Sequence, residues 1–154
     1  MDKQLLKDLV AFLGLQKSRL GVVSTISKEN TPESAFVYFA FDENINIYFA
    51  TKDTSRKFKN ITHNKNVSFA VATENPPQTL QLEGIATVHN DIENQKDLFQ
   101  DLVALASSKH FSPPISQQTE GGLEFIKISP TWIRFGNFEV RKHGDTFKEV
   151  KIND

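Results

Sequence analysis

The strongest constraint on the fold is a series of short runs of β-branched and aromatic residues, separated by turns of only a few residues. Such runs are typical of strands, and such short connections join antiparallel neighbours. Because these connections dominate, we expect one antiparallel sheet that curls into a barrel with helices packed at its rim. The predicted strands cover residues 19–27, 32–41, 44–51, 66–73, 79–90, 123–129, 131–140 and 145–152.

Three helices are predicted beside these strands. Residues 2–16 place apolar side chains at helical spacing. Residues 91–110 begin with Asp91 as a possible N-cap and end with Lys109 and His110, in agreement with the helix dipole. A shorter helix lies within "ATKDTSRKFKNITHNK", residues 50–65, and residues 111–122 are predicted to form a loop. The expected class is therefore α+β.

Two turns and one glycine predict details of the sheet. Asp42-Glu43-Asn44 separates two strand patterns, so residues 32–41 and 44–51 are predicted to pair as a hairpin. Asn75-Pro76-Pro77 is predicted to form a second turn. Gly84 interrupts the long strand 79–90 and predicts a bulge or a point where another backbone approaches closely.

Composition bounds the class of protein. The 154 residues suit one domain, residues 1–154, and 38% hydrophobic with 24% charged residues is a globular balance. The net charge of −1 creates no global field for nucleic acid or acidic membranes, and the absence of cysteine excludes disulfides and thiolate chemistry. The first residues do not resemble a signal peptide, and no apolar run approaches a membrane span. These features predict a cytoplasmic protein.

The short helix within residues 50–65 carries an unusual charge pattern. Residues 52–65 contain five cations and one acid, and Arg56, Lys57 and Lys59 crowd the predicted first turn. Cations at a helix N-terminus oppose the dipole, whereas a bound phosphate would neutralise them. Asp53, Thr54 and Ser55 are the candidate N-caps. The pattern indicates either a site for a small anion or an ordinary solvated face.

The two strands before this helix are rich in aromatic residues. If Val37 and Phe39 face the core, then Phe36 and Tyr38 face outward, and the reverse holds otherwise. Either arrangement leaves aromatic surface near the basic helix. That surface suits a flat ring attached to a phosphate or a subunit interface, and a sheet covered on both faces has the same pattern.

Other chemistry is poorly supported by the sequence. The four histidines have no metal-ligand spacing, and no phosphate-binding loop, nucleophile elbow or paired acid and base is recognisable, so neither a metal site nor catalytic residues are predicted. The stretch "AFVYF", residues 35–39, fits the end of an RNA-binding motif, but the acid Glu33 stands in the part where RNA favours a cation. We therefore expect no nucleic-acid partner.

The stretch "NINIYFATKDTSRKFKNITHNKNVSFAVA", preceded by "PESAFVYFAF" and followed by "LQLEGIATVHND", resembles a known family. It is similar to the pyridoxamine 5′-phosphate oxidase-like FMN-binding split barrels, and within them to the short general stress protein 26 type branch. The resemblance covers residues 19–90 and centres on a strand ending in Thr51, a spacer, Ser55-Arg56-Lys57 and a helix. It implies a split β-barrel of six to seven strands with flanking helices.

The resemblance also implies a cofactor and an assembly. Arg56 and Lys57 are expected to hold the FMN phosphate, and a homodimer is expected to share two such sites across its interface. The full set of residues expected to bind cofactor is Phe36, Val37, Tyr38, Ala50, Thr51, Ser55, Arg56, Lys57 and Thr79.

The sequence departs from the vitamin-processing oxidases of that family. Those enzymes carry Arg and Lys in the strand where this chain has Ala35 and Ala40, and their C-terminal Trp falls near Gly136. Their Arg-x-His substrate motif is also not evident. The departures argue against a pyridoxal-type substrate.

The expected function is an FMN-binding flavoprotein acting as an oxidoreductase on an unidentified substrate. The alternative is a noncatalytic protein that binds flavin or another flat ligand on the same barrel.

Overall fold

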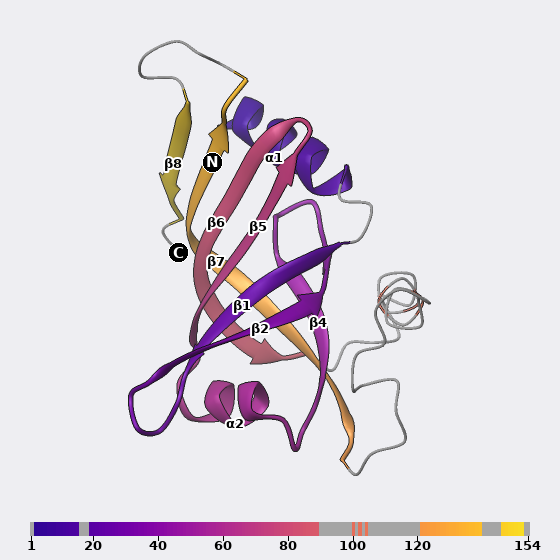
Figure 1. Ribbon diagram of the computed structural model, residues 1–154, viewed down its shortest axis with the longest axis vertical. Coiled ribbons are helices and arrows are strands. Elements are labelled where there is room, and N and C mark those ends of the chain that lie inside the picture. The colour runs from indigo at the N-terminus through magenta and orange to yellow at the C-terminus, as the bar shows by residue number, and fades with distance from the viewer. Residues whose placement is uncertain are drawn as a thin grey trace.

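The computed structural model describes residues 2–15, 19–89, 100, 102, 104, 121–139 and 146–152. The described elements form a curled antiparallel sheet with one helix at each end, as Figure 1 shows. This architecture confirms the predicted α+β split barrel. In chain order the elements are α1 (Lys3–Gly14), β1 (Leu20–Ile26), β2 (Pro32–Tyr38), β3 (Ala40–Phe41), β4 (Ile47–Lys52), α2 (Arg56–His63), β5 (Asn66–Glu74), β6 (Pro77–Val88), β7 (Leu123–Asn137) and β8 (Phe147–Lys151).

The sheet closes on itself through a bend in the chain. Its strand order is β2-β1-β5-β6-β7-β4-β3, and β8 pairs with β7 outside that path. β3 directly follows β2 after Phe39, so the two ends of the path are the two halves of one bent segment. The Phe39 side chain is fully buried, and its ring lies 5.1 Å from that of Phe69. This buried anchor fixes the bend.

The predicted hairpin between residues 32–41 and 44–51 is correct only near its turn. Ala40 pairs with Tyr48 and Phe41 with Ile47, but β2 pairs with β1 and β4 pairs with β7. The bend at Phe39 directs the two strands apart, so β2 and β4 lie near each other without forming a ladder in the described residues. This opening is the split of the barrel, and α2 begins directly after β4 at the same end.

The last part of the sheet corrects a second boundary. Residues 123–129 and 131–140 were expected to be separate strands, but β7 runs from Leu123 to Asn137 as one strand. The register shifts opposite Pro130, where Glu83 pairs with Trp132 and Gly84 with Pro130. A side-chain carbon added at Gly84 would lie 2.4 Å from the Ser129 carbonyl oxygen. The predicted bulge and close approach at Gly84 are therefore confirmed, and the bulge accommodates the proline.

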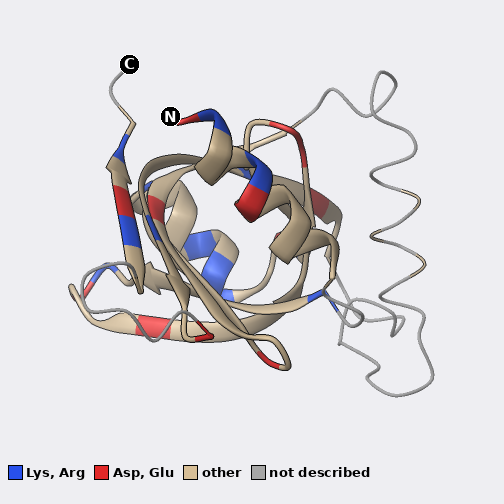
Figure 2. Ribbon diagram, turned by 90° about the horizontal axis from the view of Figure 1, so that it is seen from above, with Lys and Arg blue, Asp and Glu red and all other residues tan. Residues whose placement is uncertain are grey.

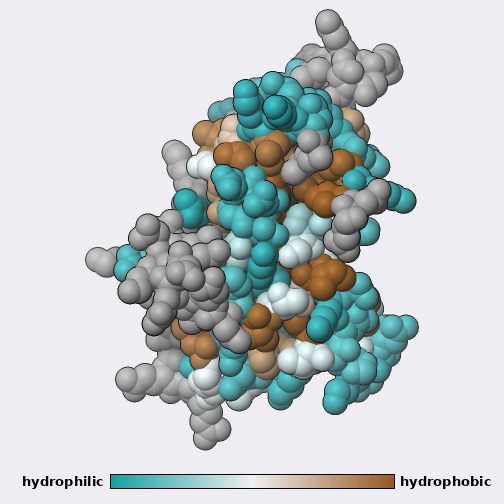
Figure 3. All heavy atoms as spheres, turned by 180° about the vertical axis from the view of Figure 1, so that it is seen from behind, coloured by the Kyte–Doolittle hydropathy of each residue, from teal (hydrophilic) through white to brown (hydrophobic). Residues whose placement is uncertain are grey.

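The inside of the barrel is one apolar cluster, closed at one end by α1. The α1 side chains of Leu5, Leu9, Phe12 and Leu13 are buried, and the Phe12 ring lies 5.6 Å from that of Phe135. Apolar side chains on the face seen in Figure 3 form several separate patches between hydrophilic ones. No helix in the described ranges is long and apolar enough to cross a membrane.

The third predicted helix, residues 91–110, lies mostly outside the described residues. Gln100, Leu102 and Ala104 are helical. Leu102 is buried in a small second cluster with Ala40, Tyr48 and Phe125. The predicted loop 111–122 also lies outside the described residues, apart from its last two glycines.

Candidate functional site

The basic helix α2 begins at the split of the barrel. Its N-cap is Ser55, one of the three predicted candidates, and the Ser55 hydroxyl accepts a hydrogen bond of 3.2 Å from the Phe58 amide. The first intrahelical bond runs from the Lys59 amide to the Ser55 carbonyl, 3.1 Å. The Arg56 and Lys57 amides therefore precede the first intrahelical donor, which is the Lys59 amide, and they point out of the helix end. Figure 2 shows the basic residues of this helix at the far end of the barrel.

Lys57 is a half-buried cation in the first turn of α2. Its Nζ donates a hydrogen bond of 3.4 Å to Thr51 Oγ1, and burial lowers the pKa of Lys57. Thr51 is only 2% exposed, and its hydroxyl lies 2.8 Å from the Ser55 hydroxyl. Among the described residues no carboxylate lies within ion-pair distance of Lys57. A partly desolvated ammonium without a counter-charge is costly, so this position favours an incoming anion.

Arg56 differs from Lys57 because the chain already provides its counter-charge. The Arg56 guanidinium is 80% exposed and forms an ion pair with Glu33 of β2. The second Glu33 oxygen accepts a hydrogen bond of 2.9 Å from the Asn60 side chain. The hydrogen bonds from Arg56 and then from Asn60 lower the pKa of the Glu33 carboxyl. The crowding of cations in the sequence is therefore offset in part by an acid from another strand, which sequence reasoning did not identify.

Asn60 anchors this ion pair to the body of the protein. The side chain is 6% exposed, and its amide nitrogen donates both to Glu33 and to Thr25 Oγ1, the latter at 3.0 Å. The three residues belong to α2, β2 and β1, so the network connects the helix to both strands at the split. Glu33 consequently has a fixed position, because a buried amide with both hydrogens engaged has little freedom to turn.

A groove follows from this arrangement. It has a volume of about 270 Å³ and lies between β1, β2 and the first turn of α2. Its lining residues are Thr25, Glu33, Ser34, Ala35, Arg56 and Lys57. The groove thus brings both predicted phosphate ligands to the beginning of β2, where an acid and an open strand edge meet them.

The edge of β2 that faces away from β1 carries hydrogen-bonding groups. The Phe39 amide donates to the Arg19 carbonyl, and the antiparallel register continues as Val37 with Gly21 and Ala35 with Val23. Alternation in an antiparallel ladder then directs the backbone groups of Ser34 and Phe36 away from β1. Among the described residues β1 is the only strand that pairs with β2, so these groups face the split.

The other predicted site residues lie in different environments. Val37 is 5% exposed and belongs to the core, whereas Phe36 is 66% exposed and Tyr38 is half-buried, which is one of the two alternations expected from the sequence. Ala50 is half-buried on β4, where it pairs with Phe125. The Val37 side chain is therefore unavailable to a ligand on the outer face.

Thr79 lies apart from the cluster around Lys57. It sits on β6, three strand positions from β2, or about 14 Å at the usual strand spacing. It pairs with Gly136, and a side-chain carbon added at Gly136 would lie 2.7 Å from Thr79 Oγ1 and 2.9 Å from the Phe147 ring. A tryptophan has no room at position 136 in this arrangement, which agrees with the departure seen in the sequence.

The fold and this end of the barrel define a class, the antiparallel split barrels with a helix N-terminus at the split. The sequence narrows the class, because residues 5–137 match the family model of pyridoxamine 5′-phosphate oxidase. The match spans most of the chain, and the protein belongs to that family. No curated protein matches the sequence significantly.

Solved structures share this fold at low sequence identity. General Stress Protein 26 from Bacillus anthracis has a TM-score of 0.69 at 21% identity, covering 97% of this chain and 99% of that chain. A protein related to general stress protein 26, from Clostridium acetobutylicum, has a TM-score of 0.69 at 14% identity, covering 99% and 97%. A pyridoxamine 5′-phosphate oxidase-related, FMN-binding protein from Nostoc punctiforme has a TM-score of 0.62 at 14% identity, covering 96% of each chain.

Proposed function

We propose that this protein binds FMN, with the phosphate at the N-terminus of α2. The observation that carries the proposal is Lys57, which is half-buried and has no carboxylate within ion-pair distance among the described residues. A phosphate there would receive charge-assisted hydrogen bonds from Lys57 and Arg56, and neutral ones from the first-turn amides. Thr51 and Ser55 hold the lysine and the helix end in position.

The flavin ring is proposed to lie along the open edge of β2. Backbone groups of Ser34 and Phe36 face the split and offer both donors and acceptors to a polar ring edge. The exposed Phe36 side chain provides apolar surface beside them. Ala50 and Thr79 remain proposed contacts on β4 and β6, whose positions relative to the ring a bound structure would determine.

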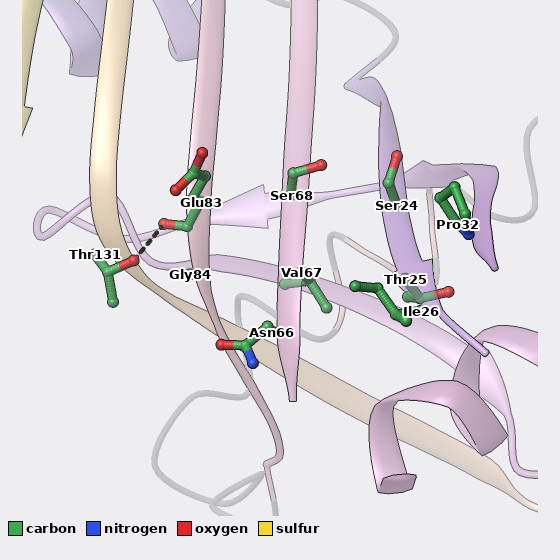
Figure 4. A pocket seen from close by; sticks show the side chains of 10 residues that line it. All are labelled: Ser24, Thr25, Ile26, Pro32, Asn66, Val67, Ser68, Glu83, Gly84 and Thr131. Atoms are coloured by element: carbon green, nitrogen blue, oxygen red, sulfur yellow. Dashed lines mark hydrogen bonds between the residues drawn. The ribbon is translucent and has the colours of Figure 1, made fainter. Parts of the chain in front are cut away.

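A homodimer is part of the proposal, and the outer face of the sheet is its interface. Ser24, Ser68 and Glu83 form a cross-strand row on β1, β5 and β6, and they line a shallow pocket of about 320 Å³ (Figure 4). The small side chains of Ser24 and Ser68 on this outer face allow close approach of a second copy, and Phe36 at the margin of the face would be covered. Sedimentation of the purified protein measures the stoichiometry directly.

The proposed activity is that of a flavin-dependent oxidoreductase in the cytoplasm. Bound FMN would supply hydride or electron transfer, while the chain supplies its position and a cationic environment. Reduction of the bound flavin by NADH or NADPH, with transfer to an acceptor faster than free flavin achieves, supports this activity. Stable FMN binding without such turnover would favour the noncatalytic flavin-binding alternative.

Titration of flavin fluorescence with the protein tests the binding site. The double variant Arg56→Ala/Lys57→Ala should weaken FMN binding by about 2–4 kcal/mol if both contacts are charge-assisted. Riboflavin, which lacks the phosphate, should bind wild type and variant equally. Lys59→Ala is the matched control, because this exposed cation lies on the same helix outside the groove. Equal FMN affinity in the double variant and wild type would reject the phosphate site.

A further inference from the structure

Glu33 places a negative charge inside a groove that otherwise suits an anion. It lines the same groove as Arg56 and Lys57, and its carboxylate is paired with Arg56. The Asn60 amide holds the second oxygen of this carboxylate at 2.9 Å and is itself fixed by Thr25 at 3.0 Å. The Glu33 carboxylate is therefore anchored to buried groups, whereas the guanidinium that it holds is mostly exposed.

This asymmetry decides which partner moves when an anion arrives. A phosphate ester at the start of α2 reaches Lys57 without breaking any ion pair. Arg56 Nη2 already donates to Glu33, so the guanidinium has to leave Glu33 in order to turn fully toward the phosphate. The Glu33 carboxylate then stays in the groove on its Asn60 anchor and repels the phosphate. The Glu33–Arg56 ion pair also lies between two grooves. Both residues line the groove at Lys57 and a second groove of about 360 Å³, which Lys59 also lines.

We infer that Glu33 is an internal competitor for Arg56, which lowers the affinity of this site for phosphate-bearing ligands and favours their release. The inference rests on the proposed phosphate site. Glu33 is a positioning residue for Arg56 in the ligand-free chain and an opponent of the phosphate in the bound one.

The test compares Glu33→Gln with wild type in two titrations. Glutamine keeps the shape and an acceptor for Asn60 while it removes the charge. The first titration follows FMN and riboflavin by flavin fluorescence, and the second follows inorganic phosphate by the amide resonances of Arg56 and Lys57. Glu29→Gln is the control, because it removes the same charge from the second groove without touching Arg56. Thermal unfolding verifies that each variant is folded.

The inference predicts that Glu33→Gln binds FMN and inorganic phosphate about three- to fivefold more tightly, the size expected for one exposed ion pair. Riboflavin affinity and the Glu29→Gln control should stay unchanged. Unchanged or weaker FMN binding by Glu33→Gln, while Arg56→Ala/Lys57→Ala loses FMN, would overturn the inference and leave the phosphate site standing. If no protein binds FMN, the proposed function fails, and the phosphate titration decides the role of Glu33 alone.

Discussion

The two helices at opposite ends of the barrel are built for different purposes. The N-cap of α1 is Asp2, whose carboxylate accepts from the Gln4 amide at 3.3 Å, so an anion of the chain itself meets the dipole. The N-cap of α2 is the neutral Ser55. α1 buries four apolar side chains, whereas α2 buries only Asn60 and Ile61. One helix closes the core, and the other presents charge at the split.

This difference teaches how a small barrel can separate stability from binding. The apolar face of α1 fills one end, so its charges matter little beyond its cap. α2 is attached by Ile61, which belongs to the core, and by a polar network through Asn60, and its first turn carries cations that its own residues do not neutralise. The charge is met by Glu33 at Arg56 and, in our proposal, by a ligand at Lys57.

The largest expected change in stability comes from α1, the helix that closes the core. Phe12→Ala should lower the free energy of unfolding by about 3–5 kcal/mol, because it removes a ring that is 1% exposed and packs on Phe135. Leu15→Ala is the control, since its side chain is 57% exposed directly after the same helix and should change stability by less than about 0.5 kcal/mol. Urea unfolding measures both. Similar losses in the two variants would contradict the assignment of α1 as the end of the core.

The next effect concerns the polar attachment of α2. Asn60→Ala should cost about 1–3 kcal/mol of stability, because it leaves Thr25 and one oxygen of Glu33 without their donor. Denaturant unfolding measures the loss, and Asn66→Ala on the exposed start of β5 is a control of the same chemistry. A loss no greater than that of the control would mean that the network does not hold the helix.

Lys57→Met separates stability from binding at one residue. Burial of Lys57 disfavours its charge and lowers its pKa, so methionine should raise the stability of the ligand-free protein by up to about 1 kcal/mol. FMN should then raise the melting temperature less than it does for the wild type. The wild type should also gain stability as the pH rises through the lowered pKa of Lys57, since the unfolded chain binds that proton more tightly. Destabilisation by Lys57→Met at neutral pH would contradict this reading.

Exchanging the caps tests the comparison itself. Ser55→Asp gives α2 the carboxylate that α1 already has, and it should stabilise the ligand-free protein by about 0.3–1 kcal/mol while it weakens FMN binding. Asp2→Ser should lower stability by a similar amount and leave FMN affinity unchanged. Melting curves with and without FMN measure both quantities. Tighter FMN binding by Ser55→Asp would place the phosphate elsewhere.

The smallest effect is the pH dependence of the Glu33 pair. The pKa of Glu33 is lowered from the ordinary value of 4.5, so its contribution to stability is present above that value and is lost as the pH falls through the lowered pKa. The stability difference between wild type and Glu33→Gln should therefore be constant near neutral pH and disappear in acid. Urea unfolding from pH 3 to 7 measures it. A difference that grows toward acid would have the wrong sign.

Local patterns predicted most of the fold, and tertiary contacts account for the errors. Alternation located the strands, and Gly84 was correctly read as a point of close approach. The hairpin prediction failed beyond its turn because the burial of Phe39 bends the chain, which no local pattern reveals. The break expected at Pro130 failed because a bulge opposite Gly84 accommodates the missing amide hydrogen.

In the candidate site, too, the features set by neighbouring residues were predictable from the sequence, and those set by tertiary contacts were not. The Ser55 cap and the basic first turn were readable from sequence, because capping depends on neighbours a few residues away. Glu33 was visible as an acid in an aromatic strand, but only the fold brings it to Arg56, 23 positions further along the chain. The burial of Val37 and the distance of Thr79 depend equally on how the sheet curls.

The bend at Phe39 has a consequence for handling the protein. By turning β2 away from β4 it leaves a row of backbone groups that can template pairing with a foreign strand. A ligand or second subunit that covers these backbone groups should also reduce aggregation. We therefore expect the ligand-free protein with an uncovered β2 edge to aggregate more readily in concentrated solution.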